Sequence, residues 1–255
     1  MPLRTRVIAT LVAVGFLVAL TAGLSAITPR RAEPLVAPPA DEPASGVDTS
    51  SYQHVGRQRI DWASVRRSGV SFAMIKATEG ATRDDPWFER DWKAAATAGL
   101  YRGAYHYARP VDGSTATDAT HFLDVVGPLD GREDLPPVLD LEENGGLDPD
   151  ALATWVVEWI DTVHQRTGRL AIIYTRPHFW TDGMAGTERF GDSPLWYAHH
   201  TEAADPGPLF GGWRAWALWQ WSATGNVPGI SVVVDLDRLA GGGPALTALA
   251  AARSS

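Results

Sequence analysis

The residues best suited to chemistry are two acids, Asp140 and Glu142, which follow a short apolar run. Residues 138–141 have the composition of a buried strand, whose side chains alternate between its two faces. The two acids therefore point the same way, roughly 6–7 Å apart along the strand. Because they repel each other and are partly removed from water, we expect at least one pKa to be raised. A carboxylic acid that stays protonated near neutral pH can protonate a glycosidic oxygen.

Two structural explanations for these acids remain open. They are solvated acids at a strand end, or acids that cap the helix expected after Asp148-Pro149. A calcium loop is disfavoured, because Ala151 occupies the twelfth position, where that loop needs glutamate. His106 and the pair His199-His200 lack the spacing of metal ligands. We therefore expect neither a metal nor a cofactor.

Short apolar runs alternate with helical stretches over most of the chain. The expected strands are 46–48, 70–77, 101–107, 138–141, 170–174, 195–198, 215–221 and 231–234, and the expected helices are 60–67, 86–98, 116–126 and 149–166. Strand–helix units predict a parallel sheet with right-handed crossovers. The fold class is therefore α/β, an irregular TIM-like (β/α) barrel of eight strands with helices reduced or missing in the last third. A doubly wound sheet is less favoured, because no Gly-rich phosphate loop follows the first strand.

Acids recur where the expected strands end, which is where such a barrel carries its chemistry. Asp48 ends the first strand, Asp140 and Glu142 the fourth, and Asp235 the last. Acids that converge on one mouth repel one another, so a structural role alone explains them poorly.

Tryptophan is abundant near the same strand ends. The chain has 11 tryptophans, and six aromatic residues crowd one segment: Trp196, Tyr197, Trp213, Trp216, Trp219 and Trp221. Flat rings suit the faces of sugars, although many of these side chains are expected in the core. We expect two or three of the tryptophans to touch a ligand.

Composition restricts the class of protein. The 255 residues include no cysteine, which excludes disulfides, thiolate metal sites and a cysteine nucleophile. The net charge is −8, and residues 1–31 hold four arginines and no acid, so the remainder is still more acidic. This charge argues against binding nucleic acid through its phosphates.

The N-terminus resembles a targeting segment. Arg4 and Arg6 precede residues 7–27, which carry no charge, and either a signal peptide or a membrane anchor is consistent with this pattern. We expect residues 1–28 to be that segment, 29–45 a Pro-rich linker, 46–242 the barrel and 243–255 a C-terminal tail. The protein is thus expected outside the cytoplasm, secreted or anchored to the membrane.

Eight short motifs in order resemble the glycoside hydrolase family 25 lysozymes, the Chalaropsis-type N-acetylmuramidases. They are Gly46–Gln53, Ile75–Gly80, Gly103–Tyr107, Val138–Glu142, Ile173–Thr175, Pro194–Ala198, Trp219–Ser222 and Val234–Asp237. The chain departs from the family at Trp221, where tyrosine is more usual, and no appended wall-binding repeats are seen.

The resemblance implies a monomeric enzyme that acts on peptidoglycan glycan strands and cuts the β-1,4 bond from N-acetylmuramic acid to N-acetylglucosamine. It implies Glu142 as acid/base, Asp140 as the residue that orients the 2-acetamido group, and Asp48 and Asp235 as electrostatic partners. The residues expected to contact the glycan are Lys76, Tyr105, Tyr107, Tyr174, Trp196 and Trp219.

Two other functions are less consistent with the sequence. A membrane-tethered wall-binding module without turnover would not need the four acids, since binding a sugar requires no acid of raised pKa. A chitinase-like D-x-x-D-x-D-x-E site fails, because Val138 stands where that pattern needs an acid.

Overall fold

The computed structural model describes residues 43–253, in which eight strands close into a barrel. The strands are β1 (Ala44–Thr49), β2 (Phe72–Glu79), β4 (Tyr101–Tyr107), β5 (Val138–Asp140), β6 (Ile172–Thr175), β7 (Leu195–Ala198), β8 (Leu218–Gly225) and β9 (Val234–Leu239). They follow the order β1-β9-β8-β7-β6-β5-β4-β2, and β1 pairs with β2 to close the ring. A two-residue strand, β3 (Arg83–Asp84), extends β2 in a hairpin. The expected irregular α/β barrel is confirmed.

Helices cover the first part of the barrel and thin out toward its end. They are α1 (Trp62–Arg67), α2 (Phe88–Thr97), α3 (Thr115–Val126), α4 (Pro149–Thr167), α5 (Pro177–Gly183) and α6 (Gly242–Ala251), with short 3₁₀ turns at Ser51–Gln53 and Val55–Arg57. No helix lies between β7 and β8 or between β8 and β9. The helix after β6 has seven residues, so the expected loss of helices in the last third is confirmed.

Helix α4 shows how local sequence sets an element. Asp148 caps its first turn by accepting a hydrogen bond from the backbone N–H of Ala151 at 2.8 Å, and Pro149 occupies the first turn. Gly168 ends the helix in the left-handed conformation, at φ 64°. The acid-rich loop before α4 thus contains a helix cap at Asp148, while Asp140 and Glu142 take no part in capping.

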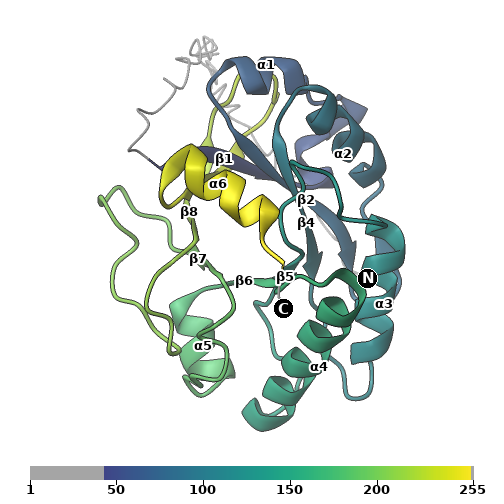
Figure 1. Cartoon of the computed structure of the whole chain (residues 1–255), viewed down its shortest axis with the longest axis vertical. Coiled ribbons are helices and arrows are strands. Elements are labelled where there is room, and N and C mark those ends of the chain that lie inside the picture. Colours follow the sequence, from purple (N-terminus) through teal and green to yellow (C-terminus); the bar gives the residue numbers. More distant parts are fainter. Residues whose placement is uncertain (1–42, 254–255) are drawn as a thin grey trace, which may run out of the picture. The chain divides into compact units, whose positions relative to one another are not determined.

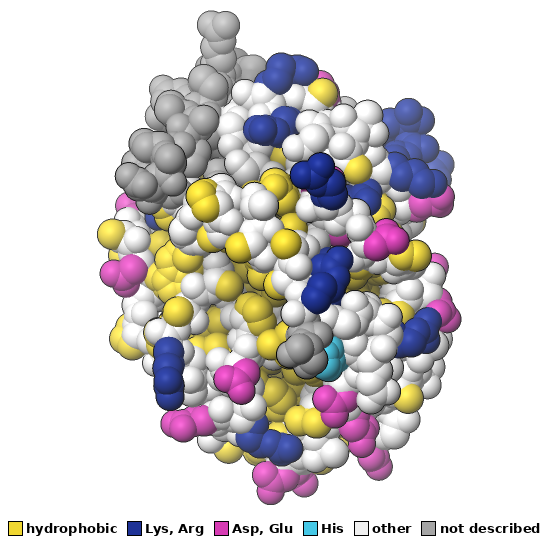
Figure 2. All heavy atoms as spheres, viewed as in Figure 1, with side chains coloured by type: hydrophobic (Ala, Val, Ile, Leu, Met, Phe, Trp, Pro, Cys, Tyr) yellow, Lys and Arg dark blue, Asp and Glu magenta, His cyan; other side chains and the backbone are white. Residues whose placement is uncertain are grey.

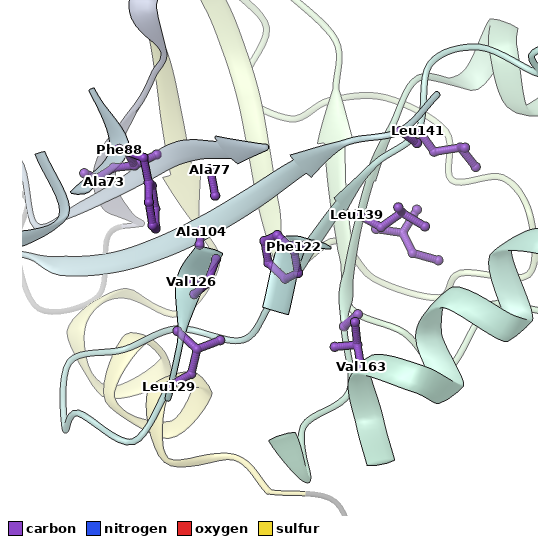
Figure 3. Close-up of a cluster of buried hydrophobic side chains, with 14 of the residues drawn as sticks. Ala73, Ala77, Phe88, Ala104, Phe122, Val126, Leu129, Leu139, Leu141 and Val163 are labelled. Atoms are coloured by element: carbon purple, nitrogen blue, oxygen red, sulfur yellow. The ribbon is translucent and has the colours of Figure 1, made fainter. Parts of the chain in front are cut away.

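The strands pack against apolar residues on both faces. On the outside, Leu139 of β5 belongs to the same buried cluster as Phe122 of α3 and Val163 of α4. Figure 3 shows these side chains between the strands and the helices. Because β5 is covered on both faces, its residues read as a continuous apolar run rather than an alternating one.

The barrel interior is filled by large side chains opposite glycines. Phe72 and Met74 of β2 point inward, and they occupy the space that a Cβ on Gly46 or Gly103 would need. One end of this inner core is closed by α6, whose Leu246 is buried in the same cluster. Figure 1 shows α6 in front of the strands, close to β1.

Two boundaries differ from those expected. The first strand begins at Ala44, inside the expected linker, and residues 243–251 of the expected tail belong to α6, which begins at Gly242. The sequence of α6 is nearly all apolar or small, so it gave no amphipathic signal, although burial against the barrel end favours such a helix.

The last strand also differs in position and direction. It was expected at 231–234 and parallel, but β9 spans 234–239 and is antiparallel to both β1 and β8. Without a crossover helix after β8, the chain turns back and pairs directly, which only an antiparallel strand allows.

Among the described residues, no helix is long and apolar enough to cross a bilayer. The expected signal peptide or anchor at 1–28 lies outside these residues. On the face drawn in Figure 2, acidic and basic side chains are interspersed, and hydrophobic side chains gather below α6.

Candidate active site

Four acids meet at the mouth of the barrel. Asp48 lies near the end of β1, Asp140 ends β5, and Glu142 follows two residues later. Asp235 lies near the start of β9 and is directly opposite Asp48 in the strand ladder. Because β9 runs antiparallel, its first residues share the mouth with the last residues of the parallel strands. The expected grouping is therefore present, although Asp235 reaches the mouth from the opposite chain direction.

Asp140 and Glu142 differ in their surroundings. Asp140 is 7% exposed, and burial, followed by the charges of Glu142 and Asp48, raises its pKa well above the usual range. The Glu142 side chain is 23% exposed, and burial raises its pKa as well. Arg176 opposes that rise, with its Nη1 3.7 Å from Glu142 Oε2. The predicted increase in pKa thus holds for both acids, with burial as its main cause.

Asp48 and Asp235 form the opposite side of the mouth. Burial, followed by the charge of Asp235, raises the pKa of Asp48 well above its usual range. Burial also raises the pKa of Asp235, which is less enclosed than Asp48. The charge of His200 lowers that pKa. Two ionised carboxyl groups opposite one another on paired strands repel each other. Simultaneous ionisation of all these acids is therefore unfavourable in the folded state.

Gln220 of β8 links three of the strands at the mouth. Its Nε2 donates to Asp48 Oδ2 at 2.7 Å, and its Oε1 accepts from the hydroxyl of Tyr174 at 2.9 Å. His200 Nε2 lies 2.9 Å from the same Oε1 and donates to it when it carries a proton. With donors converging on Oε1, the amide must present its N–H to Asp48.

Cations hold Tyr107 at the rim. Lys76 Nζ and the Arg109 guanidinium lie 4.8 Å and 4.7 Å from the centre of its ring. Both cations also bind Glu79, and Arg109 binds Glu143 at 2.6 Å. Burial, then the charges of the neighbouring acids Glu142 and Asp140, raises the pKa of the Tyr107 hydroxyl to about 12, so it stays a hydrogen-bond donor. Tyr107 is also the ladder partner of Asp140.

Three aromatic rings lie inside the barrel beside the acids, and Tyr174 is the ladder partner of Asp140. The rings of Tyr105 and Tyr174 meet the ring of Trp196 edge to face, at centroid distances of 6.4 Å and 4.8 Å. Trp196 is 1% exposed, and Tyr174 is partly exposed. These three predicted glycan contacts therefore lie near the acids, and the buried indole of Trp196 packs against both tyrosine rings.

Trp219 lies apart from this group. It is fully buried on the outer side of β8, where its ladder partner is Tyr197 of the outer core. Its Nε1 donates to the carbonyl of His199 at 2.7 Å, and Trp216 packs against its ring. Strand alternation explains this placement, since the adjacent Gln220 points inward and Trp219 must then point outward.

The sequence reasoning did not single out several residues at the mouth. Arg176 follows β6 directly, so the rule that sites lie at strand ends would have identified it. Asp237 lies two residues after Asp235, and alternation would have placed it on the same face. Gln220 and His200 carry no comparable signal, because amides and histidines are frequent at strand ends for structural reasons.

The arrangement supports acid–base chemistry. Among residues 43–253, no three His, Cys, Asp or Glu side chains are placed to hold a metal ion together. A partly exposed acid of raised pKa lies beside a buried second acid, with aromatic rings and hydroxyl donors around them. This is the arrangement expected for protonating a glycosidic oxygen while stabilising positive charge at the neighbouring sugar carbon.

Comparison with known proteins agrees with this chemistry. The profile of glycosyl hydrolases family 25 matches residues 47–230. The chain is 38% identical to Lysozyme M1 of Streptomyces globisporus over 83% of this chain and 73% of that protein. It is 34% identical to the N,O-diacetylmuramidase of Chalaropsis sp over 69% of this chain and 86% of that protein.

Solved structures lead to the same family. The bacterial lysozyme from Streptomyces coelicolor superposes with a TM-score of 0.76 and 36% identity, covering 82% of this chain and 97% of that one. A family GH25 lysozyme from Aspergillus fumigatus gives a TM-score of 0.74 and 32% identity over 83% of this chain and 99% of that one. The barrel, its carboxyl-lined mouth and these matches have one explanation: the chain is a glycosidase that belongs to glycosyl hydrolases family 25.

Proposed function

We propose that this enzyme is a muramidase, which hydrolyses the β-1,4 bond between N-acetylmuramic acid and N-acetylglucosamine in peptidoglycan. The observation that carries the proposal is the pair at the end of β5, a half-buried Glu142 of raised pKa beside the buried Asp140. Lysozymes and a muramidase among the relatives support the choice of substrate.

In this proposal Glu142 first donates its proton to the leaving oxygen and later activates water. Its raised pKa keeps it protonated closer to neutral pH, which a general acid requires. Asp140 polarises the 2-acetamido group, whose carbonyl oxygen attacks the sugar carbon in place of a protein nucleophile, an exception to the two-carboxylate scheme. Asp48 and Asp235 stabilise the positive charge that develops in the transition state.

The hydroxyls and rings around the acids would hold the sugar. Tyr107 and Tyr174 offer partly exposed rings and hydroxyls, and Lys76 and Tyr105 support them from the neighbouring strands. We assign no sugar contact to Trp219, which is fully buried on the outer side of β8.

Turnover of purified cell walls tests the proposal. We expect wild-type protein to reduce wall turbidity and to create new reducing ends of muramic acid, identified by mass spectrometry. Glu142→Gln keeps the shape of the side chain but removes its proton, and should lower the rate by about 10²–10⁴-fold. The control is Glu133→Gln, an exposed acid away from the mouth, which should lyse walls normally.

Three outcomes would count against the proposal. Glucosamine ends would move the cut to the other bond. Normal lysis by folded Glu142→Gln would reject Glu142 as the acid. Wall binding by wild-type protein without any new ends would instead favour the alternative of a wall-binding module without turnover.

The role of Asp140 is tested separately. A thiazoline mimic of the cyclic intermediate should inhibit wild type strongly and Asp140→Asn much less, because the neutral amide cannot stabilise the positive charge. A covalent sugar adduct on Asp140, Asp48 or Asp235, found by mass spectrometry, would establish a protein nucleophile instead.

We further propose that residues 7–27 direct the enzyme out of the cytoplasm, where its substrate is found. An uncleaved anchor would keep the full-length protein in the membrane fraction after a high-salt wash. N-terminal sequencing that finds a start shortly after Ala26 would indicate cleavage and release.

A further inference from the structure

A fifth acid, Asp237, lies directly beneath the mouth. It is fully buried, and in the strand ladders it is opposite Gly46 of β1 and Gln220 of β8. Asp48 comes two residues after Gly46, so it points to the same face and is a diagonal neighbour of Asp237. The strand of Asp237 therefore lies between those of Asp48 and Gln220, and Asp237 lies deeper in the barrel than the facing pair Asp48 and Asp235.

The two oxygens of Asp237 have different partners. Oδ1 accepts a hydrogen bond from Trp196 Nε1 at 2.8 Å. Oδ2 is enclosed and receives no hydrogen bond from any N–H or O–H group of the described residues. Asp48, the diagonal neighbour of Asp237 on the same face of the sheet, carries the carboxyl group that could share a hydrogen bond with this oxygen. An ionised carboxylate has no donor, so a hydrogen bond between the two acids requires a proton on one of them.

The surroundings indicate which acid carries this proton. Asp48 already accepts from Gln220 at 2.7 Å, which favours its ionised form. Asp237 lies deeper, and its single N–H donor is Trp196. Burial first, then the negative charge of Asp48, raises the pKa of Asp237 well above its usual range. Asp235 and Tyr174 also interact with Asp237, and neither is a cation.

We propose that Asp237 is a positioning residue, a neutral carboxylic acid that donates its proton to Asp48 from below while Gln220 donates from the side. The two donors hold the Asp48 carboxylate in one orientation toward the sugar. Tyr174 and His200 fix the Gln220 amide in the orientation that this requires. The inference rests on the proposed role of Asp48 in hydrolysis.

Replacing Asp237 by asparagine and by leucine distinguishes a role as a hydrogen-bond donor from a role in packing alone. In Asp237→Asn the amide nitrogen can donate to Asp48, and the amide oxygen can still accept from Trp196. We expect kcat for wall fragments to stay within about threefold of wild type. Asp237→Leu keeps the volume without the donor, and we expect kcat to fall about tenfold or more with KM within about twofold, because loss of one oriented hydrogen bond corresponds to about that factor.

A second measurement detects the proton without using activity. The infrared carbonyl band of protonated carboxyl groups should persist at pH 8 in wild type, and one component should be missing in Asp237→Asn. Asp130→Asn, an exposed acid, is the matched control and should leave the band unchanged.

The outcomes are distinct. An Asp237→Asn protein as impaired as Asp237→Leu, or one with an unchanged infrared band, would overturn the inference. If Asp237→Leu does not fold, as judged by circular dichroism, Asp237→Asn and the infrared band still decide. If wild type does not hydrolyse walls, the proposed function fails, whereas the infrared result still reports the proton on Asp237.

Discussion

The carboxyl of Glu142 experiences opposing electrostatic influences. Burial, together with the charges of Glu143 and Asp235, raises its pKa, whereas Arg176 and His200 lower it. The Arg176 side chain is 54% exposed, so water and salt weaken its effect. Burial of the acid therefore dominates, and Arg176 makes a smaller adjustment.

At this residue scale we predict that Arg176→Gln shifts the alkaline limb of the pH–activity profile to higher pH. Loss of the guanidinium raises the pKa of Glu142, so the acid stays protonated, and active, at higher pH. Exposed ion pairs are worth less than about 1 kcal/mol, so the gain in kcat/KM at a fixed alkaline pH should be below about fivefold.

The profile should be measured on soluble wall fragments at low and at high salt, with exposed Arg189→Gln as the control. The difference between Arg176→Gln and wild type should shrink as salt rises. A shift of the limb toward lower pH would contradict the electrostatic role assigned to Arg176.

Among the elements, α6 and the strand β6 are linked by one buried arginine. Arg169, just before β6, is wholly enclosed, and its guanidinium donates to the carbonyls of Asp134 and Ala250 at 2.8 Å. It also contacts the carbonyl of Leu249 at 3.2 Å. These bonds connect the C-terminal turn of α6 to the closed end of the barrel.

We predict that Arg169→Leu lowers the free energy of unfolding by about 3 kcal/mol or more, because it leaves several buried carbonyls without donors, each worth about 1–3 kcal/mol. Urea unfolding followed by tryptophan fluorescence measures the change. Arg189→Leu, on the exposed loop after α5, should change the value by less than about 0.5 kcal/mol. Equal effects of the two substitutions would show that α6 does not depend on this contact.

On the scale of the whole molecule, the acidic mouth makes stability depend on pH. Asp140, Glu142 and Asp48 each have a pKa that the fold raises. The folded state therefore binds more protons than the unfolded chain between the unfolded and folded pKa values. The stabilisation that comes from these raised pKa values is fully present at a pH below the pKa values of the unfolded chain. It is lost as the pH rises through the pKa values of the folded state.

At pH 8 the free energy of unfolding of Asp140→Asn, measured by urea unfolding, should therefore exceed that of wild type by about 0.5–2 kcal/mol, while the variant loses activity. Near pH 3 the difference should largely disappear, because Asp140 is then protonated in both states. Asp130→Asn, which is exposed, should show no such pH dependence. A variant less stable than wild type at pH 8 would mean that the ionised acid stabilises the fold.

Part of the fold could be predicted from local patterns. The expected strands 101–107 and 195–198 match β4 and β7, and the α4 boundaries follow from Asp148, Pro149 and Gly168. These features depend on neighbours a few residues away, so the sequence is sufficient. By contrast, the apolar run of α6 could not be assigned from local sequence, because it forms a helix that packs against one end of the barrel.

For the site, local spacing is enough to predict which acids share a strand face. The one-residue spacing of Asp140 and Glu142, and the repeated acids after apolar runs, are local facts. How the acids meet depends on contacts between distant segments, because β9 reverses direction and brings Asp235 opposite Asp48. The tertiary structure also placed Trp219 on the outer face of β8. The physical reason is that strand direction and the choice of face depend on pairing between segments far apart in the chain, which no local pattern records.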